Sequence, residues 1–152
     1  DPPGTVVSNR DYAYYVTTEE ILEVDIETGQ ETASAYNFYD PRSVCLTNEC
    51  IVVTHLNQMK AWEVPGLSEL WYREFNRENS TDFPTVQSVG GEYIAETDDD
   101  NSAFALRDPS DGSKVWSYGQ ATDNFIKAVA IKNGYLYQYQ TFEGGNQSVS
   151  KR

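Results

Sequence analysis

His55 is the only histidine in the chain, so any Ser-His-Asp or Cys-His catalytic group would have to use it. It follows Ile51-Val52-Val53-Thr54 and precedes residues 56–58, where we predict a surface hairpin turn. We therefore interpret His55 as an exposed turn residue. A zinc site needs about four Cys, His or carboxylate ligands, and two cysteines in a disulfide would leave too few. The Cys-x-x-Cys-His sequence that attaches haem is absent. The sequence thus predicts no catalytic residue and no enzymatic activity.

Cys45 and Cys50 lie on either side of a four-residue turn in the stretch VCLTNECIV, which would let them face each other across a hairpin. We predict a disulfide between them, which would stabilise the fold by about 2 kcal/mol through loop entropy. The alternative is two reduced cysteines that fill an apolar core in the cytosol. Asn79 and Asn146 each begin an Asn-x-Ser/Thr glycosylation triplet. These features predict a secreted or lumenal glycoprotein, whose first residue, Asp1, fits either a removed signal peptide or a trimmed segment.

The stretch ETDDDNS, residues 96–102, concentrates carboxylates in one predicted turn. Oxygen ligands suit Ca²⁺, which makes Asp98 and Asp100 candidate calcium ligands. The spacing differs from that of an EF-hand, because no Gly stands at the sixth position and no Glu at the twelfth. We favour a hydrated acidic turn over a calcium site.

Composition narrows the class of protein further. The 152 residues suffice for one domain with a hydrophobic core, and the net charge of −13 argues against nucleic acid, whose binding needs clustered Lys and Arg. No apolar run approaches the length of a membrane span. Aromatic residues make up 13% of the chain, and no long stretch keeps apolar residues at helical spacing. The sequence therefore predicts an all-β domain.

A strand-turn-strand unit recurs along the chain. Its second strand begins at Tyr12, Ile51, Tyr93 and Tyr135, at intervals of 39, 42 and 42 residues. The turns before these residues contain Asn, Asp or Gly, which suit hairpin positions that need positive φ. A second turn follows in each of the first three units and ends in Gly29, Gly66 and Gly112. We predict about four repeats of roughly 40 residues, spanning approximately residues 5–40, 41–80, 81–122 and 123–152.

A period of about 40 residues with four short strands is typical of the blade of a β-propeller. One four-stranded sheet has two apolar faces and cannot bury both alone, whereas stacking sheets around an axis buries them. Trp71 and Trp116 follow a turn Gly, and we expect them to fill the space between neighbouring blades. The alternative is that they are core residues of a β-sandwich.

The turn region resembles the quinoprotein-like (PQQ-like) repeat family, whose blades carry an Ala-x-Asp-x-x-Thr-Gly-Lys-x-x-Trp stretch. Residues 24–30 fit the first part, with Ala33 in the place of Trp, and residues 112–116 fit the second part, while Gly66 to Trp71 is one residue longer. The resemblance implies propeller blades. Related enzymes bind pyrroloquinoline quinone in an eight-bladed ring with an adjacent Cys-Cys disulfide, a calcium ligand set and an Asp base. Cys45 and Cys50 are not adjacent and four repeats are half such a ring, so we expect no cofactor.

The fourth repeat stops at Lys151-Arg152, before its last turn and strand. We therefore expect a non-catalytic extracellular module that binds proteins through loops or open strand edges. Strands from another chain would close it, or identical chains would assemble head to tail into a filament. The alternative is a segment of a larger propeller enzyme or receptor whose functional residues lie elsewhere. Sugar binding by exposed aromatic residues is a third, less favoured, hypothesis.

Overall fold

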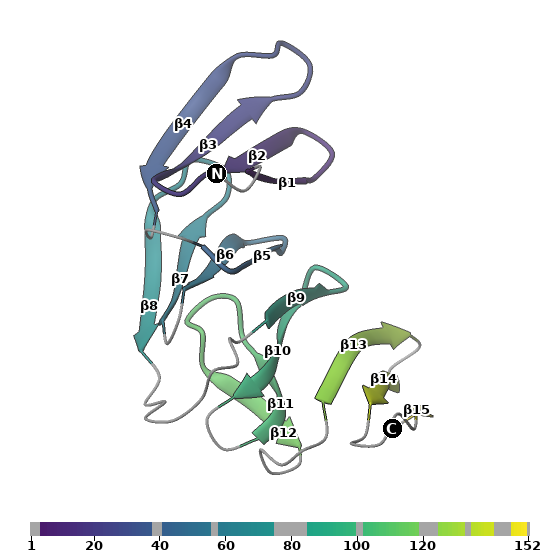
Figure 1. The fold of residues 1–152 in the computed structure, drawn as a ribbon. Helices are drawn as coiled ribbons and strands as arrows, with labels where there is room; N and C mark the ends of the chain where they lie inside the picture. Colours follow the sequence, from purple (N-terminus) through teal and green to yellow (C-terminus); the bar gives the residue numbers. More distant parts are fainter. Residues whose placement is uncertain are drawn as a thin grey trace.

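The computed structural model describes residues 4–37, 41–55, 58–74, 85–99, 102–118, 125–132, 135–141 and 147–151. Within these ranges the chain forms four antiparallel sheets whose strands follow one another in sequence order (Figure 1). The first sheet contains β1 (Thr5–Ser8), β2 (Tyr12–Val16), β3 (Glu20–Asp25) and β4 (Glu31–Tyr36). The second contains β5 (Ser43–Leu46), β6 (Cys50–His55), β7 (Gln58–Glu63) and β8 (Glu69–Glu74).

The third and fourth sheets continue this series. The third contains β9 (Thr85–Val89), β10 (Tyr93–Asp99), β11 (Ser102–Arg107) and β12 (Lys114–Tyr118). The fourth contains three strands in the described part of the chain, β13 (Phe125–Lys132), β14 (Tyr135–Thr141) and β15 (Gln147–Lys151). Each sheet lies inside one of the repeat ranges that the sequence predicts. The predicted all-β fold of successive four-stranded antiparallel sheets is thereby confirmed.

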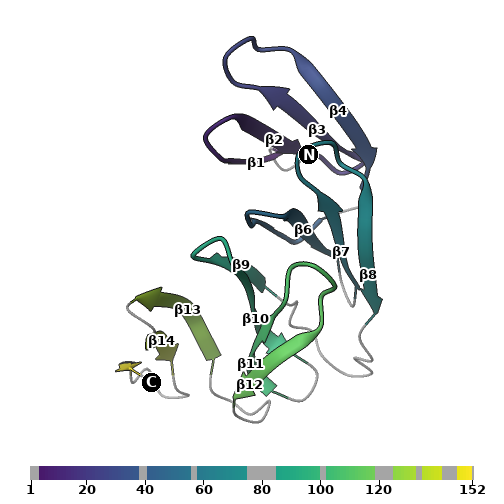
Figure 2. The same ribbon diagram turned by 180° about the vertical axis from the view of Figure 1, so that it is seen from behind.

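The sheets succeed one another along an arc, as two opposite views show (Figures 1 and 2). The first strands of successive sheets, β1, β5, β9 and β13, contact one another on the inner side of this arc. The last strands of the first three sheets, β4, β8 and β12, lie on its outer side. This is the radial stacking of propeller blades, so each inner sheet is covered on both faces.

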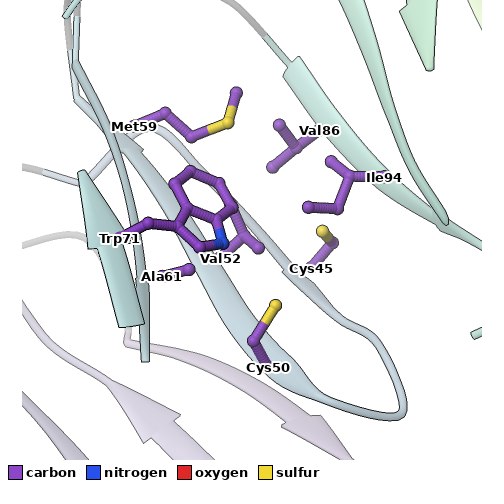
Figure 3. Close-up of a cluster of buried hydrophobic side chains, with 8 residues drawn as sticks. All are labelled: Cys45, Cys50, Val52, Met59, Ala61, Trp71, Val86 and Ile94. Atoms are coloured by element: carbon purple, nitrogen blue, oxygen red, sulfur yellow. The ribbon is translucent and has the colours of Figure 1, made fainter. Parts of the chain in front are cut away.

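Two apolar clusters fill the spaces between sheets, because alternate side chains of each strand point to opposite neighbours. The cluster between the first and second sheets includes Tyr14, Ile21, Ile51 and Trp62, all at most 2% exposed. The cluster between the second and third sheets is formed by Cys45, Cys50, Val52, Met59, Ala61, Trp71, Val86 and Ile94 (Figure 3). These clusters fix the sheets relative to each other.

The tight turns use two kinds of chemistry. Gly29, Gly66, Gly90, Gly91 and Gly112 have φ between 60° and 108°, as the sequence predicts for hairpin turns. The turns at 9–11 and 48–49 were expected to need positive φ as well, and this prediction is wrong, because the only non-Gly residue with positive φ in the described part is Leu67. In these two turns, side-chain oxygens accept hydrogen bonds from the backbone and so fix its conformation. Asn9 Oδ1 accepts hydrogen bonds from two backbone N–H groups, and Thr47 Oγ1 does the same.

Among the described residues there is no helix with the length and hydrophobicity that crossing a membrane requires.

Candidate functional site

Trp71 fills the space between the second and third sheets, as the sequence predicts. Its indole Nε1–H donates a 2.7 Å hydrogen bond to the carbonyl of Pro109, in the turn between β11 and β12. The ring also lies against Gly112, where a Cβ atom would come within 2.8 Å of the indole carbons. The second sheet therefore holds the turn of the third by an aromatic side chain on its last strand, β8.

Trp116 occupies the corresponding position on β12, since it pairs with Leu106 as Trp71 pairs with Ala61. Its side chain is 40% exposed, whereas Trp71 is 9% exposed. The expected inter-blade burial is thus found for Trp71 and not for Trp116. Trp71 is buried because it packs against the turn of the third sheet.

Glu23 links the first sheet to a turn of the second sheet, as Trp71 links the second sheet to a turn of the third. The sequence did not predict this role. It is 2% exposed, and its carboxylate accepts hydrogen bonds from Thr32 Oγ1 at 2.8 Å and from the backbone N–H of Gly66 at 2.9 Å. Burial, together with the neighbouring Glu23 carboxylate, raises the pKa of Tyr14. The sequence signal that could have indicated this role is the position of Glu23, a charged residue on the same face of β3 as the buried Ile21.

A second buried charge, also missed, belongs to the ion pair between Glu96 and Arg107. Arg107 Nε lies 2.6 Å from Glu96 Oε2, and Arg107 Nη1 donates a 3.0 Å hydrogen bond to the carbonyl of Gly112. This pair therefore ties the β11–β12 turn, which Trp71 covers, to the body of the third sheet. The buried carboxylates of Glu23 and Glu96 therefore stabilise the fold by binding other residues of the sheets.

The predicted disulfide between Cys45 and Cys50 is not formed, since both residues are free and buried. The physical reason is strand register: Cys45 pairs with Val52, whereas Cys50 lies opposite Thr47 at the end of the hairpin. The two cysteines share a face without lying directly opposite (Figure 3). Burial raises the pKa of both thiols, that of Cys50 to about 11, so they stay protonated at neutral pH.

The remaining predicted site residues do not form a site in the described part. His55 ends β6 and is half-buried, not the exposed turn residue that was expected. Asp98 lies within β10, not in a turn, and Asp100, Asn79 and Asn146 lie outside the described residues. No group of three or more Cys, His or carboxylate residues in the described ranges could hold a metal ion. Calcium binding and glycosylation stay predictions.

A pocket of about 270 Å³ lies where turns of the second and third sheets meet. It is lined by Asn48, Glu49, Glu63, Val64, Leu70 and Ser110. Asn48 N–H donates to the Gly91 carbonyl and Val64 N–H donates to the Glu49 carbonyl, so hydrogen bonds fix its rim. Its lining offers carboxylates, an amide and a hydroxyl without a cysteine or histidine nucleophile or base.

The most distinctive surface is the face of the first sheet that points away from the second. It is formed by Val6, Ala13, Tyr15, Leu22 and Val24, which we call the end face. These residues pair across β1, β2 and β3, since Val6 lies opposite Tyr15, Tyr15 opposite Leu22, and Ala13 opposite Val24. Val6 is 61% exposed and Tyr15 is 41% exposed, although Gly4 lies directly against the ring of Tyr15. An apolar sheet face is thus left open at one end of the arc.

Comparison with known proteins agrees with this architecture. No family model matches the chain, and no curated protein matches it. Solved structures do match. BamB from Moraxella catarrhalis shares 12% identity and a TM-score of 0.63 over 93% of this chain and 50% of that one. The β-propeller domain of Cps50 (Swd1) from Myceliophteria thermophila shares 12% identity and a TM-score of 0.65, over 91% of this chain and 49% of that one.

The WD40 domain of Pan2 from Neurospora crassa is also similar, with 12% identity and a TM-score of 0.60 over 96% of this chain and 45% of that one. The chain therefore spans about half the length of the structures it matches. At these identities the likeness defines the fold alone: the chain is a partial β-propeller. Membership of the PQQ-like repeat family stays a hypothesis, because no family model supports it.

Proposed function

We propose that this chain is a non-catalytic interaction module whose open end is covered by a protein partner. The observation that carries the proposal is the end face. In the second sheet, the residues that point toward the preceding sheet, Ile51, Val53 and Trp62, are at most 2% exposed. In the first sheet, Val6 and Tyr15 point in the corresponding direction and are 61% and 41% exposed, and the other residues of the end face are half-buried. Exposed contiguous apolar surface marks interaction sites in soluble proteins.

The buried reactive side chains Glu23, Arg107, Cys45 and Cys50 support a non-catalytic role because they maintain the fold. Glu23 holds the turn of the neighbouring sheet, and Arg107 holds the turn of its own. The thiols of Cys45 and Cys50 are buried, and Cys50 contacts the carbonyl of Pro109 at 3.5 Å. A nucleophile or general base needs an accessible position beside a substrate, which these groups lack.

An extracellular or lumenal location is part of the proposal. It rests on the two glycosylation triplets at Asn79 and Asn146, since the cysteines are free and give it no support. Mass spectrometry of protein from its native source, before and after removal of N-linked glycans, tests this location directly. A mass that does not change would contradict it.

Site-specific photo-crosslinking tests the interaction role. A photoreactive amino acid in place of Tyr15, in protein expressed in its native cells, is expected to give one defined crosslinked species. Tyr72 is the matched control, because it is a tyrosine of similar exposure, 46% against 41%, on a different sheet. No adduct at position 15, or equal adducts at both positions, would contradict the proposal.

The second candidate is a portion of a larger propeller enzyme or receptor whose functional residues lie outside this chain. The supporting observation is that the chain spans about half the length of the propellers it matches. The encoding reading frame distinguishes the two. Further repeats at the same period on either side would favour this candidate and would place another blade of the same polypeptide on the end face.

A further inference from the structure

The pocket of about 270 Å³ between the second and third sheets has the size and the lining of a binding site. Pockets that hold drug-sized molecules measure about 300 to 1,000 Å³, so this one has room for a single side chain or a group of similar size. We propose that it binds the guanidinium side chain of an arginine that a protein partner presents. The pocket lies apart from the end face of the first sheet, so this inference goes beyond the proposed function.

Hydrogen bonds hold the turns that form the pocket. Val64 N–H donates to the Glu49 carbonyl at 3.0 Å, which joins two turns of the second sheet. Asn48 N–H donates to the Gly91 carbonyl at 2.8 Å, which ties a turn of the third sheet to the same place. A ligand therefore enters a pocket whose backbone is already ordered, and this lowers the entropic cost of binding.

Two carboxylates, those of Glu49 and Glu63, line the pocket. Strand pairing brings the two residues together, because Glu63 lies opposite Cys50, which directly follows Glu49. Both glutamates are exposed, and within the described ranges neither side chain forms an ion pair. Lys60, the cation nearest to Glu63 in the sequence, is bound to Glu69 at 2.6 Å instead. The pocket therefore carries negative charge that the described part of the chain does not neutralise.

A third carboxylate, that of Asp108, adds to the negative potential beside the pocket. It accepts a 2.6 Å hydrogen bond from the hydroxyl of Ser110, which is one of the lining residues. Burial raises the pKa of Cys50, and the negative charges of Glu49 and Asp108 raise it further, so both carboxylates act on the same junction. The net charge of −13 attracts a basic partner over longer distances.

The apolar part of the lining favours arginine among cations. Val64 and Leu70 contribute aliphatic surface, and Leu70 is 38% exposed. Arginine has an aliphatic stem that packs on such a surface, and its guanidinium has five N–H donors that can reach more than one carboxylate. Ca²⁺ needs about six to eight oxygen ligands, whereas the described residues contain no group of three or more Cys, His or carboxylate residues that could hold a metal ion. The lining therefore matches a guanidinium on an aliphatic stem.

An NMR titration of the ¹⁵N-labelled chain tests the proposal, with the peptide acetyl-Gly-Arg-Gly-amide as the probe. Saturable shifts are expected for the backbone amides of Glu49, Val64 and Ser110, with a dissociation constant of about 1 mM, because a single side chain supplies the affinity. Raising the NaCl concentration from about 0.05 M to about 0.5 M should weaken binding, since salt screens ion pairs. The peptide with lysine in place of arginine should bind more weakly, and the peptide with uncharged citrulline should not give saturable shifts.

Two double variants that remove the same charge identify the site. Glu49→Gln with Glu63→Gln should raise the dissociation constant of the arginine peptide at least about tenfold, because both charged acceptors of the pocket are lost. Glu27→Gln with Glu31→Gln is the matched control, since these exposed glutamates lie at the last turn of the first sheet, and the constant should change less than about twofold. The dispersion of the NMR spectra verifies that both variants fold. Equal weakening by the two pairs would mean a general effect of charge and would overturn the proposal.

The peptide series also separates this proposal from the interaction role of the end face. The absence of saturable shifts at about 20 mM arginine peptide, well above the expected constant, would overturn the pocket assignment, as would equal affinity for the citrulline or the lysine peptide. If the arginine peptide does not bind but Tyr15 crosslinks to a protein in cells, the interaction role stands and the pocket assignment is wrong. If the peptide binds but Tyr15 gives no crosslink, the pocket assignment stands and the role of the end face is wrong.

Discussion

Replacing Gly112 by Ala tests the contact between the second and third sheets most directly. Gly112 has φ of 70°, and a Cβ atom there would lie within 2.8 Å of the Trp71 ring. Left-handed backbone costs an L-residue about 1 to 2 kcal/mol, and overpacking a filled space costs about 1 to 3 kcal/mol. We expect Gly112→Ala to lower the free energy of unfolding by about 2 to 5 kcal/mol in total.

Gly29 provides the matched control. It has nearly the same φ, 69°, and its N–H donates to the carbonyl four residues earlier, as the N–H of Gly112 does. A Cβ atom at Gly29 would meet nothing within 4 Å. Gly29→Ala should therefore cost only the backbone term, about 1 to 2 kcal/mol.

Urea unfolding followed by far-UV circular dichroism measures both free energies, provided that the slopes with denaturant are equal. The difference between the two variants isolates the contact with Trp71. In a Trp71→Leu background, which removes the ring atoms concerned, the excess cost of Gly112→Ala should disappear. Equal destabilisation by Gly112→Ala and Gly29→Ala in the parent protein would refute the assigned packing.

Three further predictions concern the buried polar groups. Glu23→Gln should lower the free energy of unfolding by about 1.5 to 3 kcal/mol, because the amide accepts only one of the hydrogen bonds from Thr32 and Gly66; calorimetry measures this loss, and an unchanged melting temperature would contradict it. Arg107→Met should cost about 3 to 5 kcal/mol by leaving the carboxylate of Glu96 buried without its cation, and restoring most of that stability by adding Glu96→Gln in the same chain is the result that the ion pair predicts. The pKa of Cys50 is raised by burial from 9.0 to about 11, so its contribution to stability is complete below about pH 9 and is lost as the pH rises toward 11. In the native state at pH 8 the thiols should react with Ellman's reagent far more slowly than in urea, and equal rates would contradict their burial.

Local sequence was sufficient to predict the blades and their turns. Gly29, Gly66 and Gly112 indicate turns because only glycine adopts positive φ without strain. Their regular spacing between apolar strands predicts stacked four-stranded sheets, and it placed Trp71 between two of them. Each turn and strand depends on residues within a few positions of each other, and the recurrence of the same pattern at intervals of 39, 42 and 42 residues indicates that the unit repeats.

Contacts between sheets could not be predicted in the same way. Glu23 is separated from Gly66 by 43 residues, and its burial is compensated only because the turn of the second sheet presents an N–H to it. Cys45 and Cys50 have the sequence separation of a hairpin disulfide, but the strand register offsets them. Trp71 and Trp116 follow similar turns and differ in burial because of what lies alongside each.

The sequence by itself determined the repeat, the strand content and the turn positions, since backbone geometry and the alternation of side chains are local properties. Only the tertiary structure decided which charges are buried, which cysteines remain free and which apolar face stays open. Those outcomes depend on the side chains that a neighbouring sheet brings against each residue. The open end face is of this kind, because its composition differs little from that of the covered faces and only its position at the end of the arc leaves it exposed.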